Sequence, residues 1–278
     1  MSAPLLICTD LDGTLIPDGR AAESPEARTA FARCVERPEV SLAYVTGRHR
    51  ALIEEAIAEF SLPVPDFVIG DVGTSIYDVA GAEWVAAAQW DEALQAQWEP
   101  ETPHRLRSAL EGPCFLQLQD ETRQGRFKLS YDVAPEVDGE EVLAQSRRQL
   151  EALEVEVRLI FSRDSQGVGL LDVVPSSAGK LPAIDFLINR GRFRPERFLF
   201  AGDSGNDMDV FVSPLPAVVV ANASATVRER AQRIARDRGL SAKLYLAQTG
   251  PLGMNGNYSA GILQGLVHFV SESEEWLS

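Results

Sequence analysis

Short apolar runs alternate with amphipathic stretches over the first part of the chain. The runs at residues 5–8, 42–45 and 67–69 have no helical period, which is typical of fully buried parallel strands. Between them, residues 24–35 open with Ser24-Pro25, a helix N-cap signal, and residues 52–60 place their apolar side chains on one helical face. This alternation of strands and helices predicts a doubly wound α/β sheet.

The pattern changes near residue 84 and returns after residue 172. Residues 115–118, 127–131 and 155–159 alternate apolar and polar positions, as antiparallel strands with one wet face do. Buried runs at 198–201 and 217–220 then resume, with helices expected over 178–188, 225–236 and 261–270. We therefore expect a mostly parallel, Rossmann-like core sheet from residues 1–83 and 173–278, and an inserted α+β domain over residues 84–172.

Charge and cysteine content narrow the possible partners. The 278 residues carry 41 acidic and 26 basic side chains, a formal net charge of -15, and a surface this acidic repels nucleic acid and anionic membranes. The three cysteines show no CxxC spacing, and no apolar run reaches the length of a membrane span. We expect a cytoplasmic protein that binds neither nucleic acid nor membrane. Because the surface is acidic, any site that binds an anion must be made positive by a metal, a basic side chain or helix N-termini.

Polar clusters follow several of the expected strands. Asp10 and Asp12 come directly after the first strand, and because they are two residues apart on an extended segment, both carboxylates face one site. Thr46, Gly47 and Arg48 follow the second strand and offer a hydroxyl, backbone N–H groups and a guanidinium to an anion. Open α/β sheets bind ligands at this edge. Taken alone, each cluster is also typical of a turn or a helix cap.

Two further clusters lie in the second half of the core. Lys180 stands at the start of an expected helix, where a cation is unfavourable unless an anion lies beside it. Asp203, Asn206 and Asp207 follow the strand expected at 198–201. Carboxylates gathered at one sheet edge repel each other unless a cation is bound. Because the donors are oxygens, with no His or Cys among them, they favour Mg²⁺.

The four clusters, in this order, resemble the motifs of the haloacid dehalogenase superfamily of phosphohydrolases. The resemblance implies that Asp10 is the nucleophile, Asp12 the general acid/base and Lys180 a catalytic cation. It implies that Asp10, the Asp12 carbonyl and Asp203 hold Mg²⁺, with Asp207 at or near the metal. Thr46, Gly47, Lys180 and Asn206 match phosphate-holding positions of the superfamily, and Arg48 lies beside them.

The position of the inserted domain, between the second and third motifs, resembles the type-IIB cap subclass. Within that subclass, four segments are similar to the sucrose-phosphate phosphatase group: 125–130 (GRFKLS), 171–175 (LDVVP), 202–207 (GDSGND) and 220–223 (VANA). That group usually carries His before the cap lysine, where this chain has Phe127, so the exact disaccharide stays open. Mannosylfructose-phosphate phosphatase is similar and stays an alternative. The resemblance implies that Lys128, one of only three lysines, contacts the sugar or the phosphate.

The resemblance therefore implies a Mg²⁺-dependent phosphatase for sucrose 6-phosphate or a similar disaccharide phosphate, acting through an aspartyl-phosphate. Three other functions remain open on sequence alone. They are a sugar phosphomutase, a phosphatase for mannosylglycerate phosphate or trehalose phosphate, and a non-catalytic sugar-phosphate-binding module. Association with a glycosyltransferase of the same pathway is a further expectation.

Overall fold

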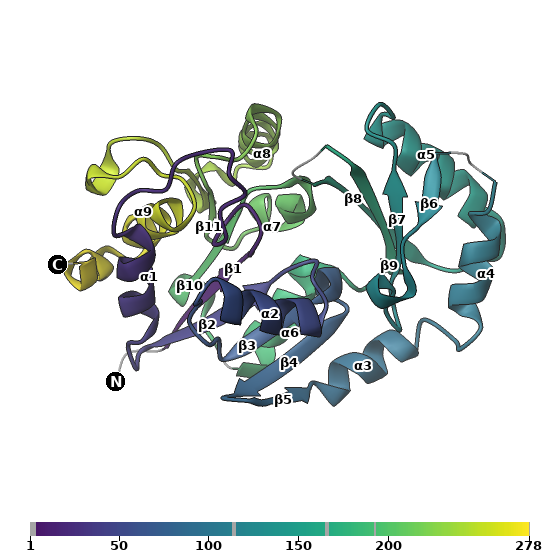
Figure 1. Ribbon diagram of the computed structural model, residues 1–278, viewed down its shortest axis with the longest axis horizontal. Helices are drawn as coiled ribbons and strands as arrows, with labels where there is room; N and C mark the ends of the chain where they lie inside the picture. Colours follow the sequence, from purple (N-terminus) through teal and green to yellow (C-terminus); the bar gives the residue numbers. More distant parts are fainter. Residues whose placement is uncertain (1–3, 113–114, 165–166, 192, 278) are drawn as a thin grey trace.

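The computed structural model describes residues 4–112, 115–164, 167–191 and 193–277, which form a larger and a smaller lobe (Figure 1). Both chain termini lie in the larger lobe, and the smaller lobe comes from the middle of the chain (Figure 1). This arrangement is that of a core with an inserted domain. None of the helices in the described ranges is long and apolar enough to cross a membrane.

An eight-stranded sheet forms the centre of the larger lobe, in the order β12-β11-β10-β1-β2-β3-β4-β5. Its strands are β1 (Leu5–Thr9), β2 (Val40–Val45), β3 (Phe67–Gly70), β4 (Ser75–Ala80), β5 (Glu83–Ala86), β10 (Phe198–Gly202), β11 (Ala217–Val219) and β12 (Leu244–Leu246). The strands from β12 to β3 are parallel, and β4 and β5 add an antiparallel hairpin. The mostly parallel α/β sheet expected from the sequence is confirmed.

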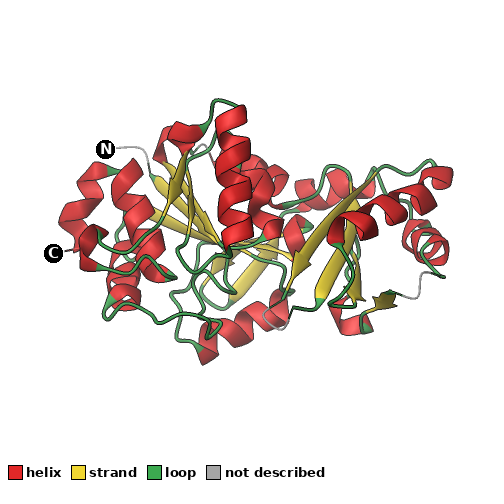
Figure 2. Cartoon of the chain, turned by 90° about the horizontal axis from the view of Figure 1, so that it is seen from above, coloured by secondary structure: helices red, strands yellow, loops and turns green. Residues whose placement is uncertain are grey.

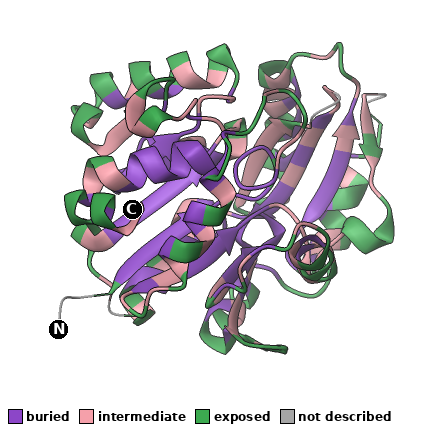
Figure 3. Cartoon of the chain, turned by 60° about the vertical axis from the view of Figure 1, so that its left-hand side comes forward, coloured by how far each residue is buried: buried purple, intermediate pink, exposed green. Residues whose placement is uncertain are grey.

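Helices cover both faces of this sheet, because alternate residues of a buried strand point to opposite sides. On β1, Leu5 and Ile7 belong to one apolar cluster, whereas Leu6 and Cys8 belong to the other. The first cluster includes side chains of α1 (Ala27–Val35), α2 (Arg50–Glu59) and α9 (Ser259–Phe269). The second includes side chains of α6 (Lys180–Gly191), α7 (Met208–Phe211) and α8 (Ala225–Asp237). The sheet is therefore doubly wound, and its strands are buried on both faces (Figure 3).

The smaller lobe is built on a four-stranded antiparallel sheet in the order β6-β7-β9-β8. Its strands are β6 (Leu116–Leu118), β7 (Leu129–Val133), β8 (Val157–Arg163) and β9 (Gly169–Pro175), and its helices are α3 (Ala88–Gln95), α4 (Thr102–Ala109) and α5 (Gly139–Leu150). Leu106 of α4 and Val142 of α5 are fully buried in the same apolar cluster as Val133 and Leu171 of the sheet. Seen from above, the helices α4 and α5 lie on the side away from the larger lobe (Figure 2).

Two local expectations need correction. Helix α1 is capped by Glu26 in a left-handed conformation (φ 62°) and begins at Ala27, whereas Ser24 accepts a hydrogen bond from the distant Asn255 N–H. Strand β5 pairs with β4, so residues 83–86 belong to the larger sheet. The expected divisions at 83/84 and 172/173 fall within β5 and β9. The domain limits stay a prediction. If each strand is kept whole, the limits fall after Ala86, at the end of β5, and after Pro175, at the end of β9.

Candidate active site

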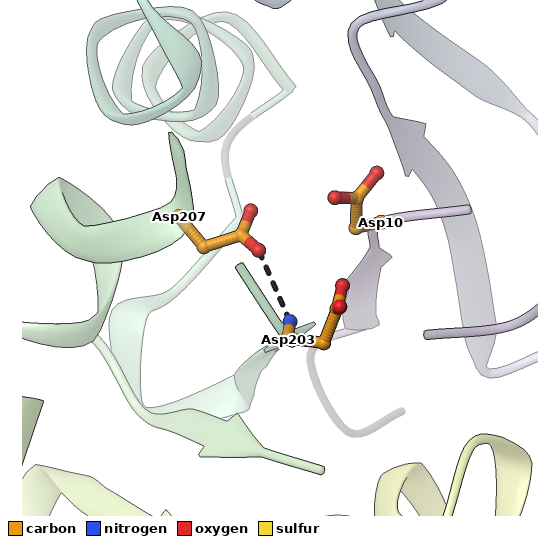
Figure 4. Close-up of side chains that lie close together, drawn as sticks. All are labelled: Asp10, Asp203 and Asp207. Atoms are coloured by element: carbon orange, nitrogen blue, oxygen red, sulfur yellow. Dashed lines mark hydrogen bonds between the residues drawn. The ribbon is translucent and has the colours of Figure 1, made fainter. Parts of the chain in front are cut away.

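Three carboxylates converge at the carboxyl edge of the large sheet. Asp10 directly follows β1, Asp203 directly follows β10, and Asp207 lies in the short 3₁₀ turn Gly205–Asp207. These carboxylates offer oxygens that all lie within 4.8 Å of one another (Figure 4). Parallel pairing of β1 with β10 makes both strands end at the same edge, and the 3₁₀ turn after β10 returns Asp207 to it. The sequence prediction that these motifs share one site agrees with this geometry.

Lys180 lies between two of these carboxylates. Its Nζ donates to Asp10 Oδ2 at 2.7 Å and to Asp207 Oδ1 at 2.6 Å, and its side chain is only 1% exposed. Burial alone would lower the pKa of Lys180, but the two carboxylates raise it above its ordinary value, so the ammonium stays charged. The anion expected beside this first-turn lysine is thus a pair of aspartates of the chain itself.

The acidic loop is held by its own hydrogen bonds. Asp207 Oδ2 accepts the backbone N–H of Asp203 at 3.1 Å (Figure 4). The same oxygen accepts the Ser204 N–H at 3.1 Å, while Oδ1 accepts from Lys180. Thr14 donates its hydroxyl to Asp203 Oδ1 at 3.0 Å. All the oxygens of Asp207 are therefore engaged, so this side chain orients the lysine and the loop that carries Asp203.

Negative charge exceeds positive charge among these buried groups. Burial raises the pKa of Asp10 to about 7, with a further contribution from Asp207 that the nearby Lys180 only partly opposes. Burial and the neighbouring Asp10 raise the pKa of Asp203 well above its usual value. One ammonium serves three convergent carboxylates, and a divalent cation would compensate the remaining charge. Oxygen donors from Asp10 and Asp203 suit Mg²⁺, so the residues present fit the expected ion.

The second motif contributes the rim of the site. Thr46 is buried at the end of β2, and its Oγ1 accepts the Arg48 N–H at 3.3 Å. The Arg48 guanidinium forms two hydrogen bonds with the Asp12 carboxylate, 2.8 Å to Oδ2 and 2.6 Å to Oδ1. Arg48 thus holds the expected acid/base residue, which is itself exposed to solvent. The phosphate contact expected of Arg48 stays a prediction.

A cavity of about 570 Å³ opens above these residues, between the two lobes. The core contributes the site residues Asp10, Asp12, Thr46, Gly47, Arg48, Asp203 and Asn206 to its lining, together with Asp18, Arg20 and His49. The smaller lobe contributes Gln119, Arg123, Lys128, Ser130, Ser162 and Asp172 among others. The walls thus carry hydroxyl, amide, carboxylate and cationic groups, as a cavity for a polyhydroxylated ligand requires.

Lys128 lies on the polar face that strand alternation predicted, but it lies before the strand and not within it. Phe127, Leu129 and Tyr131 enter the apolar core, and Lys128 and Ser130 face the cavity, but Lys128 precedes β7 in a bridge with Gly125. Its side chain is 5% exposed, and its Nζ lies 3.1 Å from Asp71 Oδ1 of the larger lobe. Sequence reasoning did not identify Asp71 as its partner.

A second pair in the smaller lobe also escaped the sequence analysis. Ser130 donates its hydroxyl to Asp172 Oδ1 at 2.5 Å across the β7–β9 ladder. Burial raises the pKa of Asp172, and the nearby Lys128 and the hydrogen bond from Ser130 partly oppose this rise. Strand alternation could have placed Ser130 and Asp172 on the face of Lys128, but it carried no sign that this face meets another lobe.

The chain matches a known protein family over most of its length. The family of sucrose-6F-phosphate phosphohydrolases matches residues 3–270. A HAD-like hydrolase of Nitrosococcus oceani is 44% identical over the whole chain, which spans 75% of that protein. Sucrose-phosphatase 2 of Nicotiana tabacum is 30% identical over 80% of the chain, and a mannosylfructose-phosphate phosphatase of Agrobacterium fabrum is 28% identical over 78%. The matched region spans 51% of the tobacco protein and 83% of the Agrobacterium one.

Solved structures show the same relationship. The sucrose-phosphatase of Synechocystis sp., determined in complex with sucrose and phosphate, superimposes with a TM-score of 0.77 at 26% identity and covers 96% of this chain and 98% of that one. A sugar phosphatase of haloacid dehalogenase subclass IIB shares the fold, with a TM-score of 0.57 at 14% identity. From its sequence motifs, its fold and the family match over residues 3–270, this chain belongs to the sucrose-6F-phosphate phosphohydrolase family of the haloacid dehalogenase superfamily.

Proposed function

We propose that this protein is a Mg²⁺-dependent phosphatase that hydrolyses a disaccharide phosphate such as sucrose 6-phosphate through an aspartyl-phosphate on Asp10. The observation that carries the proposal is the buried Lys180, which donates to both Asp10 and Asp207. Of these two carboxylates, Asp10 lines the polar cavity between the two lobes. Burying an ammonium between carboxylates carries a desolvation penalty, which points to a functional role for Lys180. Beside a nucleophile, the ammonium can offset the charge of the phosphoryl oxygens.

In the first step, an Asp10 carboxylate oxygen attacks phosphorus and the bond from phosphorus to the sugar oxygen breaks. Asp10 Oδ1 accepts the Leu11 N–H at 2.7 Å and Oδ2 accepts from Lys180, so the nucleophile is held in one orientation. The leaving sugar oxygen takes a proton from Asp12, whose exposed carboxyl borders the cavity. Lys180 offsets the charge of the phosphoryl oxygens.

In the second step, water attacks phosphorus, Asp12 removes the proton of that water, and the bond to Asp10 breaks to release phosphate. Asp10, the Asp12 carbonyl and Asp203 would hold Mg²⁺, with Asp207 supporting them. When bound, Mg²⁺ would lower the pKa of Asp10 from about 7 and neutralise charge on the phosphoryl group. Thr46, Gly47 and Asn206 border the cavity where the phosphoryl oxygens would lie.

The size of the cavity accommodates a disaccharide phosphate, and its lining suits a sugar. About 570 Å³ lies in the ordinary range for a small-molecule site, and its far wall is formed by Lys128, Ser130 and Asp172 of the smaller lobe. These three side chains combine a cation, a hydroxyl and a carboxylate, which can donate to and accept from sugar hydroxyls. The relatives named for sucrose phosphate and mannosylfructose phosphate support the same substrate class.

A screen of sugar phosphates for released phosphate tests the proposal. It should include sucrose 6-phosphate, mannosylfructose phosphate, trehalose phosphate, mannosylglycerate phosphate and glucose 6-phosphate, each with Mg²⁺ and with EDTA. We expect a disaccharide phosphate to be hydrolysed with the highest kcat/KM and EDTA to abolish the reaction. Full activity without metal, or a preference for glucose 6-phosphate, would contradict the proposal. Association with a glycosyltransferase stays a prediction.

A further inference from the structure

The peptide group after Gly13 is held by a residue from a distant part of the chain. Asn222, in the segment that follows β11, donates its Nδ2 to the Gly13 carbonyl at 2.6 Å. Gly13 comes directly after Asp12, in the loop that carries the proposed nucleophile and acid/base residue. The proposed chemistry assigns no task to Asn222.

Gly13 is constrained from its other side as well. It has a φ of +73°, and a Cβ at this position would lie 2.5 Å from Asp203 Oδ2. The loop therefore packs its backbone directly against the carboxylate expected to bind the metal. Asp203 therefore limits one face of Gly13, and Asn222 holds its carbonyl, so the backbone directly after Asp12 is held by two contacts.

The Asn222 amide is itself oriented by a strained residue. Its Oδ1 accepts the Tyr258 N–H at 2.9 Å, which leaves Nδ2 as the group that faces Gly13. Tyr258 has φ 49° and ψ -130°, a conformation that non-glycine residues rarely adopt, and it is fully buried. Its hydroxyl donates to Asp18 Oδ1 at 2.8 Å and accepts the Ala21 N–H at 3.2 Å. Tyr258 thus contacts the far end of the same loop.

We infer that Asn222, oriented by Tyr258, is a positioning residue that fixes the loop from Asp10 to Gly13 for phosphoryl transfer. This inference rests on the proposed function and adds a residue to it. Asn222 would act without touching substrate, by holding the Gly13 carbonyl and hence the direction of the Asp12 backbone. Misplacement of reacting groups by about 1 Å is enough to slow a reaction by about 10²-fold.

Asn222→Asp separates positioning from general packing. The substitution keeps the size of the side chain and the acceptor for the Tyr258 N–H, but replaces the donor to Gly13 with a second carboxylate oxygen. Asn257→Asp is the matched control, because Asn257 Nδ2 donates to the carbonyl of Ala22 at 2.9 Å, further along the same chain segment. Both variants gain one negative charge and lose one amide-to-carbonyl hydrogen bond.

The experiment measures two properties of the parent and both variants. Turnover of para-nitrophenyl phosphate with Mg²⁺ gives kcat and KM without a sugar, and hydrogen–deuterium exchange of residues 11–16 reports the loop without metal or substrate. In Asn222→Asp we expect kcat to fall about tenfold or more with KM within about threefold, and faster exchange of residues 11–16. Asn257→Asp should match the parent in both.

Parent-like kcat and exchange in Asn222→Asp would overturn the inference, and so would equal losses in both variants. A parent that releases no phosphate from any substrate would instead contradict the proposed function. In that case the exchange of residues 11–16 still decides whether Asn222 holds the loop.

Discussion

Replacing Lys180 with methionine removes the one cation that the described residues place among the buried carboxylates. The Lys180 side chain is 1% exposed, and its partners Asp10 and Asp207 are 6% and 0% exposed. Methionine is unbranched and apolar, so it fills the space of the lysine stem without replacing the charge. The variant therefore isolates the electrostatic contribution of the ammonium.

The expected loss of stability follows from this burial. Removing one partner of a buried ion pair costs about 3–5 kcal/mol, because the other charge is left without compensation. For a chain of this size, that loss lowers the Tm by roughly 6–20 °C. Adding Mg²⁺ should restore part of the Tm, since it supplies positive charge to the same carboxylates. Catalysis should stay lost, because the ammonium no longer faces the phosphoryl group.

Thermal unfolding in EDTA and in Mg²⁺ measures both effects. Lys243→Met is the matched control, because Lys243 is partly exposed and forms no ion pair with another described residue, and its Tm should stay near that of the parent. Lys180→Met combined with Asp207→Asn should be more stable than Lys180→Met alone, since one carboxylate fewer is left unpaired. A Lys180→Met protein that unfolds in EDTA at the parent temperature would refute the reasoning.

Two further predictions concern Asp10 and Lys128. Burial raises the pKa of Asp10 from 3.8 to about 7, so the metal-free folded state binds this proton more tightly than the unfolded state, and the contribution of Asp10 to stability falls as the pH rises from about 4 to 7. In urea unfolding with EDTA, the free energy of unfolding of Asp10→Asn minus that of the parent should therefore increase as the pH rises from about 4 to 7. A difference that decreases over this range would contradict the sign. Lys128→Met should lower kcat/KM for the disaccharide phosphate about tenfold, near 1.4 kcal/mol, with little change for para-nitrophenyl phosphate. Equal kcat/KM values for the disaccharide phosphate would show that Lys128 only pairs with Asp71.

Much of the core could be predicted because its signals are local. Apolar runs located β1, β2 and β3, and motifs placed directly after strands located Asp10, Thr46 and Asp203 at one edge. Lys180 was identified from its unfavourable place at a helix start, and the structure supplies the anions that this place required. These inferences needed only periodicity, chain order and charge.

Contacts between distant segments could not be read in this way. Asp12 and Arg48 are 36 residues apart, and no local pattern indicates that the guanidinium holds the acid/base residue. The pairing of Lys128 with Asp71 depends on how two lobes meet, and Asp71 itself has a left-handed backbone that sequence patterns did not suggest. The change of pattern near residue 84 places residues 84–86 in the inserted domain, although β5 pairs with β4 and extends the core sheet.

The phosphorylation state of Asp10 during turnover tests the central claim most directly. Asp12→Asn keeps the nucleophile but loses the proton shuttle that hydrolyses the intermediate, whereas Asp10→Asn loses the nucleophile. Intact-mass measurement of each variant, mixed with para-nitrophenyl phosphate and Mg²⁺, should show one added phosphoryl group on Asp12→Asn and none on Asp10→Asn. A phosphorylated Asp10→Asn protein would contradict the account, because the nucleophile would then lie elsewhere in the chain.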